Sequence, residues 1–529
     1  MDELKFHKIF RALSLAATVS LAGAAFAETK TWVGVLPEEE DATAALASVA
    51  TNWSPEGVPT AEDDILLDGS SSVNLTWDGL TDGMPKMVKS WTQTADYTGI
   101  VTVPTTKESG FNVLTVTGDC LLSGGTWTHS EDTTSASGSK VGLFLSVGGN
   151  LETGPEFTFD GRGKGYKSCG GPSAGQGGTK TKYQYGVAHG GEGGWYWDQA
   201  TSFRYGTVYD SMTEPNDLGS SGLNQRGGGL IHIEVAGDFI HAGALTVQGA
   251  AGSDTAIVGT GGSVYISART LTGAGSINAC CGTSSIYSPG SGGGRIAIDV
   301  RETEGYDAFR AGFTGAITAH SGVFGSTKYP KNRLYGGPGT IYVKTASDRH
   351  GTLVLDNANT GSSLTYDEYS SAKVLSAETW TLDRLYLSRC GRLAVAGTIE
   401  LPNPAAIISD GAVKNHIRLD GGALVFTELS DGADYPVSDY DLVIREASEI
   451  PYTLVFSPDC TLRFLKPVTL TVHRLCIGGV YFERGVYTTA EINEKVGSTV
   501  AVNSLAASDE SCGSIEVLKN PPGLFIILR

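Results

Sequence analysis

One pattern recurs along the middle of the chain at a spacing of about 32 to 34 residues, and it constrains the fold more than any other feature. Each copy begins with a glycine pair or triplet and continues as a strand in which apolar and polar residues alternate. The three clearest copies begin at Gly227, Gly261 and Gly292. Because one copy is too short to bury its own apolar face, neighbouring copies have to stack on one another. The pattern therefore predicts a repetitive β fold.

Two further segments extend the repeat, a full copy at 143–161 and a partial copy at 336–343. Equivalent strands of a parallel β-helix lie in register along its axis, so Ile231 is expected to share an inward apolar row with Val264 and Ile296. We therefore predict an all-β fold, a right-handed parallel β-helix or solenoid. The outward positions are expected to form a solvated face, and they are His232, Glu234, Tyr265, Ser267, Arg295 and Asp299.

We divide the chain into four regions on composition and pattern. These are a signal peptide (1–27), an N-terminal β cap region (28–139), a glycine-rich parallel β-helix (140–350) with a long glycine-rich insert (162–226), and a β-rich C-terminal region (351–529). In the first region after the leader, Trp32 and Trp53 are expected to cap the stack, and 43–50 to form a short helix. The alternation after 350 fits either further coils or a β-sandwich. Since no acidic, basic or proline-rich linker separates the regions, we expect one elongated body.

The first 27 residues have the organisation of a secretory leader. Lys5, Lys8 and Arg11 form a basic segment, an apolar stretch follows over 12–24, and Ala25-Phe26-Ala27 is a cleavage signal. No later stretch reaches the roughly 18 consecutive apolar residues that a membrane span needs. We therefore expect an exported protein without a membrane span, whether secreted, periplasmic or on the cell surface.

Composition excludes some partners and cofactors. The chain has 71 glycines and a net charge of −19, and removal of a leader with three basic and two acidic residues makes the charge −20. Binding of nucleic acid needs a basic face, so we expect no nucleic-acid partner. Eight cysteines could pair in 105 ways, and the adjacent Cys280 and Cys281 are interpreted as buried thiols. We expect no metal site and no cofactor, because the cysteines lack metal-ligand spacing.

The glycine-rich insert gathers aromatic and charged residues, and long excursions from a rigid scaffold often carry function. Flat rings beside carboxylates and an arginine offer a sugar both a stacking face and hydrogen-bond partners. The candidate ligand-binding residues are His189, Glu192, Trp195, Tyr196, Trp197, Arg204 and Tyr205. Two alternatives remain open: the rings pin a glycine loop onto the stack, or they contact a protein partner.

Evidence for catalysis in the sequence is weak. Gly171–Gly175 matches G-x-S-x-G, but no helical pattern follows it, so we attribute the match to chance. Glu234 and Asp299 are expected about two coils apart, too far for a pair of catalytic carboxylates. A non-enzymatic role in adhesion or binding is therefore favoured, with a polysaccharide or a surface protein as partner. A β-helix polysaccharide lyase or glycoside hydrolase is the first alternative, and a purely structural surface component is the second.

Several of these motifs together resemble a known family. The glycine-rich openings at 227–233, 273–279 and 291–298, the insert segment 188–194 and the N-terminal Trp32-x-Gly34 motif are similar to those of secreted bacterial glycine-rich, adhesin-like parallel β-helix proteins. The likeness is to autotransporter passengers, without the translocator barrel. It implies a rigid β-helical arm at the cell surface or outside the cell that contacts glycans or proteins.

Overall fold

Strands dominate the fold. The computed structural model describes residues 27–36, 44–78, 86–106, 112–133, 141–167, 169–173, 186–194, 206–222, 225–252, 257–283, 290–322, 335–360, 370–411, 415–457, 460–497, 502–504 and 513–521. Two α-helices occur within these ranges, α1 (Tyr306–Gly312) and α2 (Thr489–Val496). Neither of them has the length and apolar character of a membrane-crossing helix.

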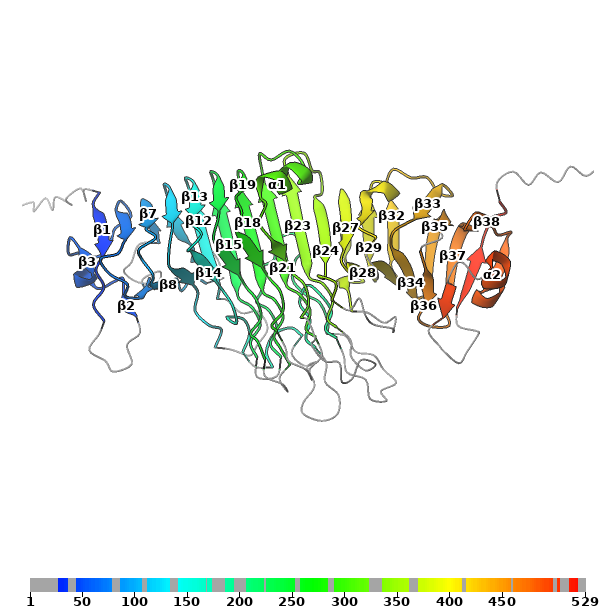
Figure 1. Cartoon of the computed structure of the whole chain (residues 1–529), viewed down its shortest axis with the longest axis horizontal. Helices are drawn as coiled ribbons and strands as arrows, with labels where there is room; N and C mark the ends of the chain where they lie inside the picture. The colour runs from blue at the N-terminus through cyan, green and yellow to red at the C-terminus, as the bar shows by residue number, and fades with distance from the viewer. Residues whose placement is uncertain are drawn as a thin grey trace, which may run out of the picture.

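Three largely parallel sheets build the N-terminal part of the molecule (Figure 1). In sheet order, sheet A contains β3 (Trp53–Ser54), β1 (Thr29–Trp32), β4 (Asp64–Leu67), β7 (Ser90–Gln93), β10 (Cys120–Leu122), β13 (Leu151–Thr153), β16 (Phe239–His241) and β19 (Leu271–Thr272). Sheet B contains β2 (Ala45–Leu46), β5 (Leu75–Thr76), β8 (Ile100–Thr102), β11 (Thr126–Thr128), β14 (Thr158–Asp160), β17 (Ala244–Thr246), β20 (Ser276–Asn278) and β22 (Ile317–Thr318). Sheet C contains β6 (Met87–Val88), β9 (Leu114–Val116), β12 (Leu143–Val147), β15 (Leu230–Val235), β18 (Ser263–Ala268), β21 (Arg295–Val300), β23 (Thr340–Thr345), β24 (Thr352–Asp356), β27 (Arg384–Ser388) and β30 (Ile407–Ser409). The chain visits sheets C, A and B in turn, as β12, β13 and β14 and then β15, β16 and β17.

Parallel pairing continues in the C-terminal part, after the antiparallel contact of β23 with β24. Sheet D contains β25 (Ala372–Val374), β28 (Arg392–Val395), β31 (His416–Asp420), β34 (Asp441–Glu446), β36 (Leu462–Phe464) and β40 (Val502–Ser504). Sheet E contains β26 (Thr379–Thr381), β29 (Thr398–Leu401) and β32 (Ala423–Phe426). Sheet F contains β33 (Asp434–Val437), β35 (Ser448–Phe456), β37 (Thr469–Ile477), β41 (Ser514–Val517) and β39 (Gly485–Thr488), with β38 (Val480–Tyr481) beside β37. The mostly parallel pairing favours further coils over a sandwich, whose sheets are antiparallel.

The register of sheet C confirms the inward row predicted from the repeat. Ile231 pairs with Val264, and Val264 pairs with Ile296. The row continues upstream to Leu143 and downstream to Ile341, so the two outer copies also take part in the sheet. All five side chains are buried. Burial of such a side chain contributes about 1.5 to 3 kcal/mol, and this continuous row is therefore a major source of stability.

The same sheets continue upstream of residue 140. Trp32 and Trp53 are buried at the N-terminal end, with ring centroids 5.1 Å apart, in agreement with a capping role. The helix expected over 43–50 is wrong. Ala45–Leu46 is strand β2, which pairs with β5, and the short 3₁₀ turn begins at Ala50. Pairing with strand β5 outweighs the local helix propensity of the alanines.

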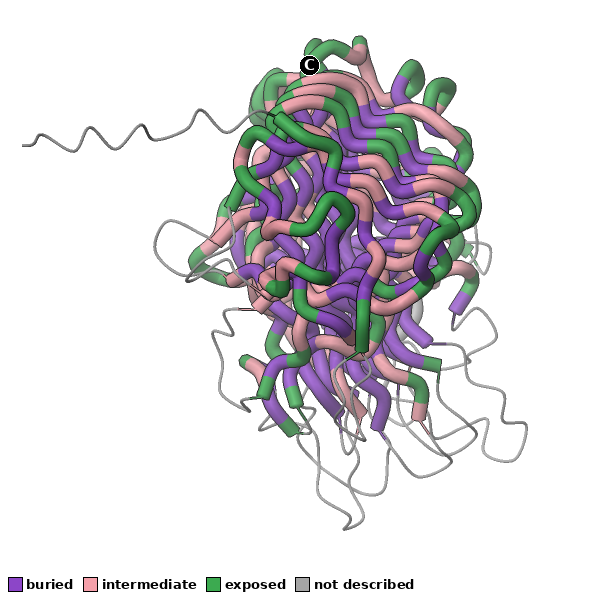
Figure 2. Tube along the Cα trace, turned by 90° about the vertical axis from the view of Figure 1, so that its left-hand side faces the viewer, coloured by how far each residue is buried: buried purple, intermediate pink, exposed green. Residues whose placement is uncertain are grey.

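A layer of glycine-rich segments extends from the sheets, between the end of sheet B and the start of sheet C. The segments are 161–165, 186–194, 219–222, 227–229, 247–250, 259–262, 279–282, 291–294, 319–322 and 336–339. Figure 2 shows that buried chain continues below the sheets into this region. The segments lie outside the strands, and they bond to one another through backbone groups, as in Gly228 N to Thr260 O at 2.9 Å and Gly262 N to Val247 O at 2.8 Å. We call them the glycine-rich layer.

The backbones in this layer approach too closely for side chains to stand between them. A Cβ added at Gly228 would lie 1.7 Å from Val247 O, and one at Gly293 would lie 1.7 Å from Ala319 O. The Cα–H groups of these glycines therefore face carbonyl oxygens, a weak but recurrent attraction between packed backbones. The glycine pairs and triplets of the repeat are thus a steric requirement of the layer.

We predict that Gly228→Ala destabilises the protein by about 2 kcal/mol or more, because the new methyl group has to displace backbone. Thermal unfolding followed by circular dichroism checks this. Gly312→Ala at the end of α1 is the matched control, since its Cβ would lie 3.5 Å from the nearest atom, an ordinary contact. Equal melting temperatures for the two variants would contradict the close approach.

Candidate functional site

The structure describes two of the seven candidate ligand-binding residues, His189 and Glu192, and both are buried within the glycine-rich layer. Trp195, Tyr196, Trp197, Arg204 and Tyr205 lie outside the described residues. The segments on either side of that aromatic stretch, 186–194 and 206–222, are described. The candidate site can therefore be built from its two flanks.

Backbone hydrogen bonds place both flanks in the layer. Gly190 N donates to Gly293 O at 3.0 Å, which joins the first flank to the segment that precedes β21. Tyr209 N donates to His189 O at 3.1 Å, which joins the second flank to the first. The two ends of the aromatic stretch are therefore held side by side against the repeat.

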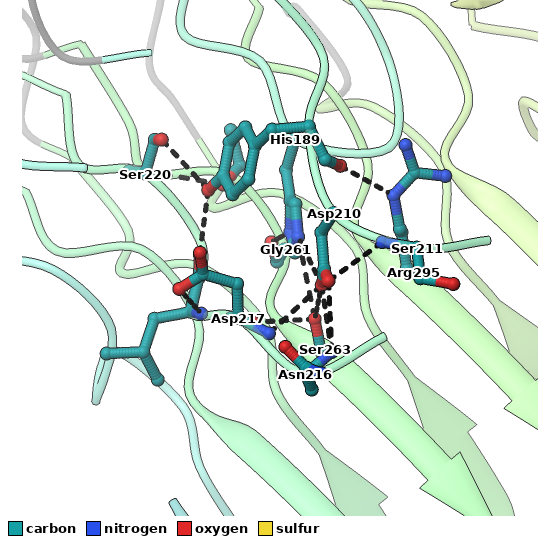
Figure 3. Close-up of polar contacts among 12 residues, drawn as sticks. His189, Asp210, Ser211, Asn216, Asp217, Ser220, Gly261, Ser263 and Arg295 are labelled. Carbon is teal, nitrogen blue, oxygen red and sulfur yellow. Dashed lines mark hydrogen bonds and ion pairs between the residues drawn. The ribbon is translucent and has the colours of Figure 1, made fainter. Parts of the chain in front are cut away.

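His189 lies at the centre of a buried polar network (Figure 3). Its Nδ1 lies 2.8 Å from Gly261 O, and because a carbonyl only accepts, Nδ1 carries the hydrogen of that bond. Its Nε2 lies 3.5 Å from both Asp210 Oδ2 and Ser263 Oγ. The Tyr209 ring stacks on the imidazole with a centroid distance of 4.5 Å. The ring thus contacts both flanks and the first residue of β18.

The Asp210 carboxylate closes the second flank into a turn. It accepts backbone hydrogen bonds from Ser211 at 2.8 Å, Asn216 at 3.1 Å and Asp217 at 3.0 Å. Burial raises the pKa of Asp210, but the interactions with His189, Arg295 and the Asn216 N–H outweigh burial and lower it to about 2. The group is therefore an ionised carboxylate that orders the turn around itself.

This constellation contains serine, histidine and aspartate, but its geometry differs from that of a nucleophilic triad. A triad needs an accessible serine that gives its proton to the histidine. Ser263 Oγ instead contacts Asp217 O at 2.6 Å and Asp210 Oδ2 at 3.0 Å. Ser263 and His189 are fully buried, so no substrate reaches them. The network is suited to anchoring the insert on sheet C.

Arg295 completes the network and corrects one expectation. It was expected on the solvated face of the repeat, yet it is only 2% exposed. Its Nε donates to Tyr209 O at 2.8 Å and its Nη1 to Thr340 Oγ1 at 3.2 Å. The second flank covers the start of β21, and burial lowers the pKa of Arg295. The alternation of apolar and polar residues correctly predicted that Arg295 lies on the outer side of sheet C. It did not predict that the second flank, 206–222, covers this position.

Glu192 ties the first flank to the C-terminal part of the molecule. Both of its carboxylate oxygens accept from Arg418 Nη2 at 3.1 Å, and both side chains are 1% exposed. Lys373 Nζ lies 3.6 Å from Glu192 Oε1 and donates to Asp420 Oδ2 at 3.1 Å. Burial raises the pKa of Asp420, but Arg418, Lys373 and Arg445 lower it well below its ordinary value. The cluster joins the insert to β25 and β31.

The outer face of sheet C carries a row of rings, and we asked whether a sugar could stack there. Phe144, His232 and Tyr265 occupy the same register position on neighbouring strands. His232 and Tyr265 stack at 4.5 Å, and the Phe144 and His232 centroids are 5.7 Å apart. The facing sides of the His232 and Tyr265 rings cover each other and Phe144 is buried, so these surfaces are not open to a sugar ring. The row stabilises the sheet through cross-strand pairs.

The remaining expectations on chemistry concern metals and thiols. No group of three or more His, Cys, Asp and Glu side chains that could hold a metal ion occurs within the described ranges. Cys280 and Cys281 are buried in the glycine-rich layer, as interpreted from the sequence, and burial raises the pKa of the Cys281 thiol. No protein-family model, curated protein or solved structure matches the chain.

We predict that Asp210→Asn lowers the free energy of unfolding at pH 7 by about 2 kcal/mol, the value that corresponds to a pKa of about 2 in place of 3.8. A carboxyl whose pKa is lowered by folding stabilises the protein above pH 3.8, and this contribution is lost as the pH falls through about 2. Chemical denaturation of wild type and variant should show the difference narrowing over that range. A difference independent of pH would contradict the ionised state, and Asp431→Asn, at an exposed site, is the control.

We predict that Glu192→Gln lowers the free energy of unfolding by about 2 kcal/mol, because the change removes one of the two buried carboxylates that Arg418 contacts, the other being Asp420. Glu446→Gln is the matched control. Its partner is Lys466 and both side chains are almost half exposed, so its loss should be below about 1 kcal/mol. If the two variants melt at the same temperature, the insert is not held by this ion pair.

Proposed function

We propose that the protein is an exported, right-handed parallel β-helix that binds an extracellular polysaccharide and has no catalytic role. The coil is inferred from the order in which the chain visits its sheets. Each passage from sheet C through A and B returns to a parallel neighbour in sheet C, as from β12 to β15. Crossovers between parallel strands are right-handed in about 98% of known cases, which supports the proposed handedness.

The observation that carries the binding role is the immobilisation of both flanks of the aromatic stretch. His189, Glu192 and Asp210 are buried and committed to internal bonds, so they act as anchors. A recognition segment held at both ends by a rigid scaffold loses less entropy on binding than a free loop. We therefore assign sugar contact to the aromatic side chains between the flanks and positioning to the anchors.

Charge narrows the class of ligand. The mature chain carries −20, so its surface repels acidic polymers at low ionic strength. Neutral polysaccharides avoid this repulsion. Their hydroxyl groups bind through hydrogen bonds, and the nonpolar faces of their rings bind through aromatic side chains.

We predict that the mature protein, residues 28–529, binds at least one neutral polysaccharide in affinity electrophoresis against a panel of polymers. Trp195→Ala combined with Trp197→Ala should weaken this binding at least about tenfold, because two aromatic contacts are lost. Tyr481→Ala, an exposed aromatic on β38, is the control for loss of a surface ring.

The same panel tests the absence of catalysis. Release of reducing ends or of unsaturated uronates from any polymer would overturn the non-enzymatic role. Unchanged binding by the double tryptophan variant would remove the aromatic stretch from the contact surface. If the wild type binds none of the polymers, the proposed function itself is overturned.

A further inference from the structure

A groove of about 680 Å³ crosses successive strands in the C-terminal part of the molecule. Its lining comes from the turn between β28 and β29, the turn between β31 and β32, the start of β35, and strands β37 and β41. These strands follow one another along the long axis in Figure 1, so the groove runs along that axis. We call it the C-terminal groove.

Small residues form the floor of the groove. Ala396 and Gly397 line it on one rung, Gly421 and Gly422 on the next, and Ala447 on the third. A Cβ added at Gly397 would lie 2.1 Å from Leu375 O, and one at Gly422 would lie 2.3 Å from Gly397 O. Successive coils therefore pack backbone against backbone at this corner.

Polar side chains form the wall at the C-terminal end. Glu449, Thr471 and Glu516 occupy one register row on β35, β37 and β41. Thr471 Oγ1 donates to Glu516 Oε2 at 3.2 Å, while Glu449 is exposed. Two residues earlier on the same strands, β37 and β41, Thr469 Oγ1 and Ser514 Oγ lie 2.9 Å apart. The wall therefore presents hydroxyl groups and two carboxylates toward one side of the groove.

The chemistry of this lining selects an uncharged polyhydroxyl chain. Carboxylates accept strong hydrogen bonds from neutral donors such as sugar hydroxyl groups, and the threonines both donate and accept. No lysine or arginine is among the residues that line the groove. An acidic polymer would meet two carboxylates without a compensating cation, and like charges at close range repel it. The volume lies within the usual range of about 300 to 1,000 Å³ for small-molecule sites.

We propose that the C-terminal groove is a binding site for a neutral polysaccharide chain that lies along the long axis of the molecule. The proposal rests on the glycan-binding function above and adds a contact surface separate from the aromatic stretch. Glu449 and Glu516 bind sugar hydroxyl groups, and the glycine and alanine floor admits the chain to the backbone. Occupation by an extended polymer agrees with a groove that crosses several rungs.

Two groove variants and one control test the site. Ala447→Trp places a large side chain in the groove. Because Ala447 is exposed, the tryptophan does not have to fit into the core, and the protein should still fold. Glu449→Gln combined with Glu516→Gln removes both charges without changing shape. Glu152→Gln, an exposed carboxylate on β13, is the matched control. Circular dichroism melting curves establish that each variant is folded.

The probes are soluble neutral glucan, xylan, galactan and mannan, with polygalacturonate as the acidic polymer. We expect wild type and Glu152→Gln to bind one of the neutral polymers equally, and both groove variants to bind it at least about tenfold more weakly. If the folded groove variants bind the neutral polymer as tightly as the wild type does, the groove is not a binding site, and the proposed function is unaffected. Binding of polygalacturonate alone overturns the assignment to neutral chains. Binding of none of the five polymers by wild type overturns the proposed function together with the groove.

Discussion

The close approach of glycine backbones is the interaction on which the rest of the structure depends. In the glycine-rich layer, carbonyl oxygens of one segment occupy the space that a Cβ of the next would take, as at Gly228 and Val247. Extended segments packed this closely satisfy one another's backbone hydrogen bonds without forming strands, as from Gly294 N to Ala279 O. The layer adds a second body of buried chain beside the apolar core of the sheets, and its segments pack closely where glycine removes the side chain.

The glycine-rich layer contains few large side chains, and buried polar groups add to its apolar contacts in fixing the position of the insert. His189 and Asp210 hold the insert to β18, and Glu192 with Arg418 holds it to β31. These groups are paired and hydrogen-bonded, as burial of charge requires. Because these side chains are buried and bonded within the protein, they do not contact a ligand directly. We therefore propose that recognition belongs to surfaces that the anchors position and to the C-terminal groove, whose floor is formed by small residues.

Most of the fold followed from local patterns. The inward row of Ile231, Val264 and Ile296 and its two extensions were predicted because alternation reports which side chains face the core. The site was less accessible to such reasoning. Glu192 meets Arg418 across 226 residues of sequence, and Ser263 looks like any polar residue at the start of a strand. No spacing rule connects these positions, because the lengths of the excursions between coils vary.

The sequence by itself determined that this chain stacks short strands around an apolar core, with glycine at the positions where backbones meet. Both properties recur in the copies of the repeat, so each copy indicates them independently. Only the tertiary structure decided that Arg295 is covered, that Glu192 joins the two parts of the molecule, and that a groove crosses the turns at Gly397 and Gly422. These depend on contacts between coils and excursions far apart in the chain. Such contacts are set by how the coils stack in space, which no single repeat encodes.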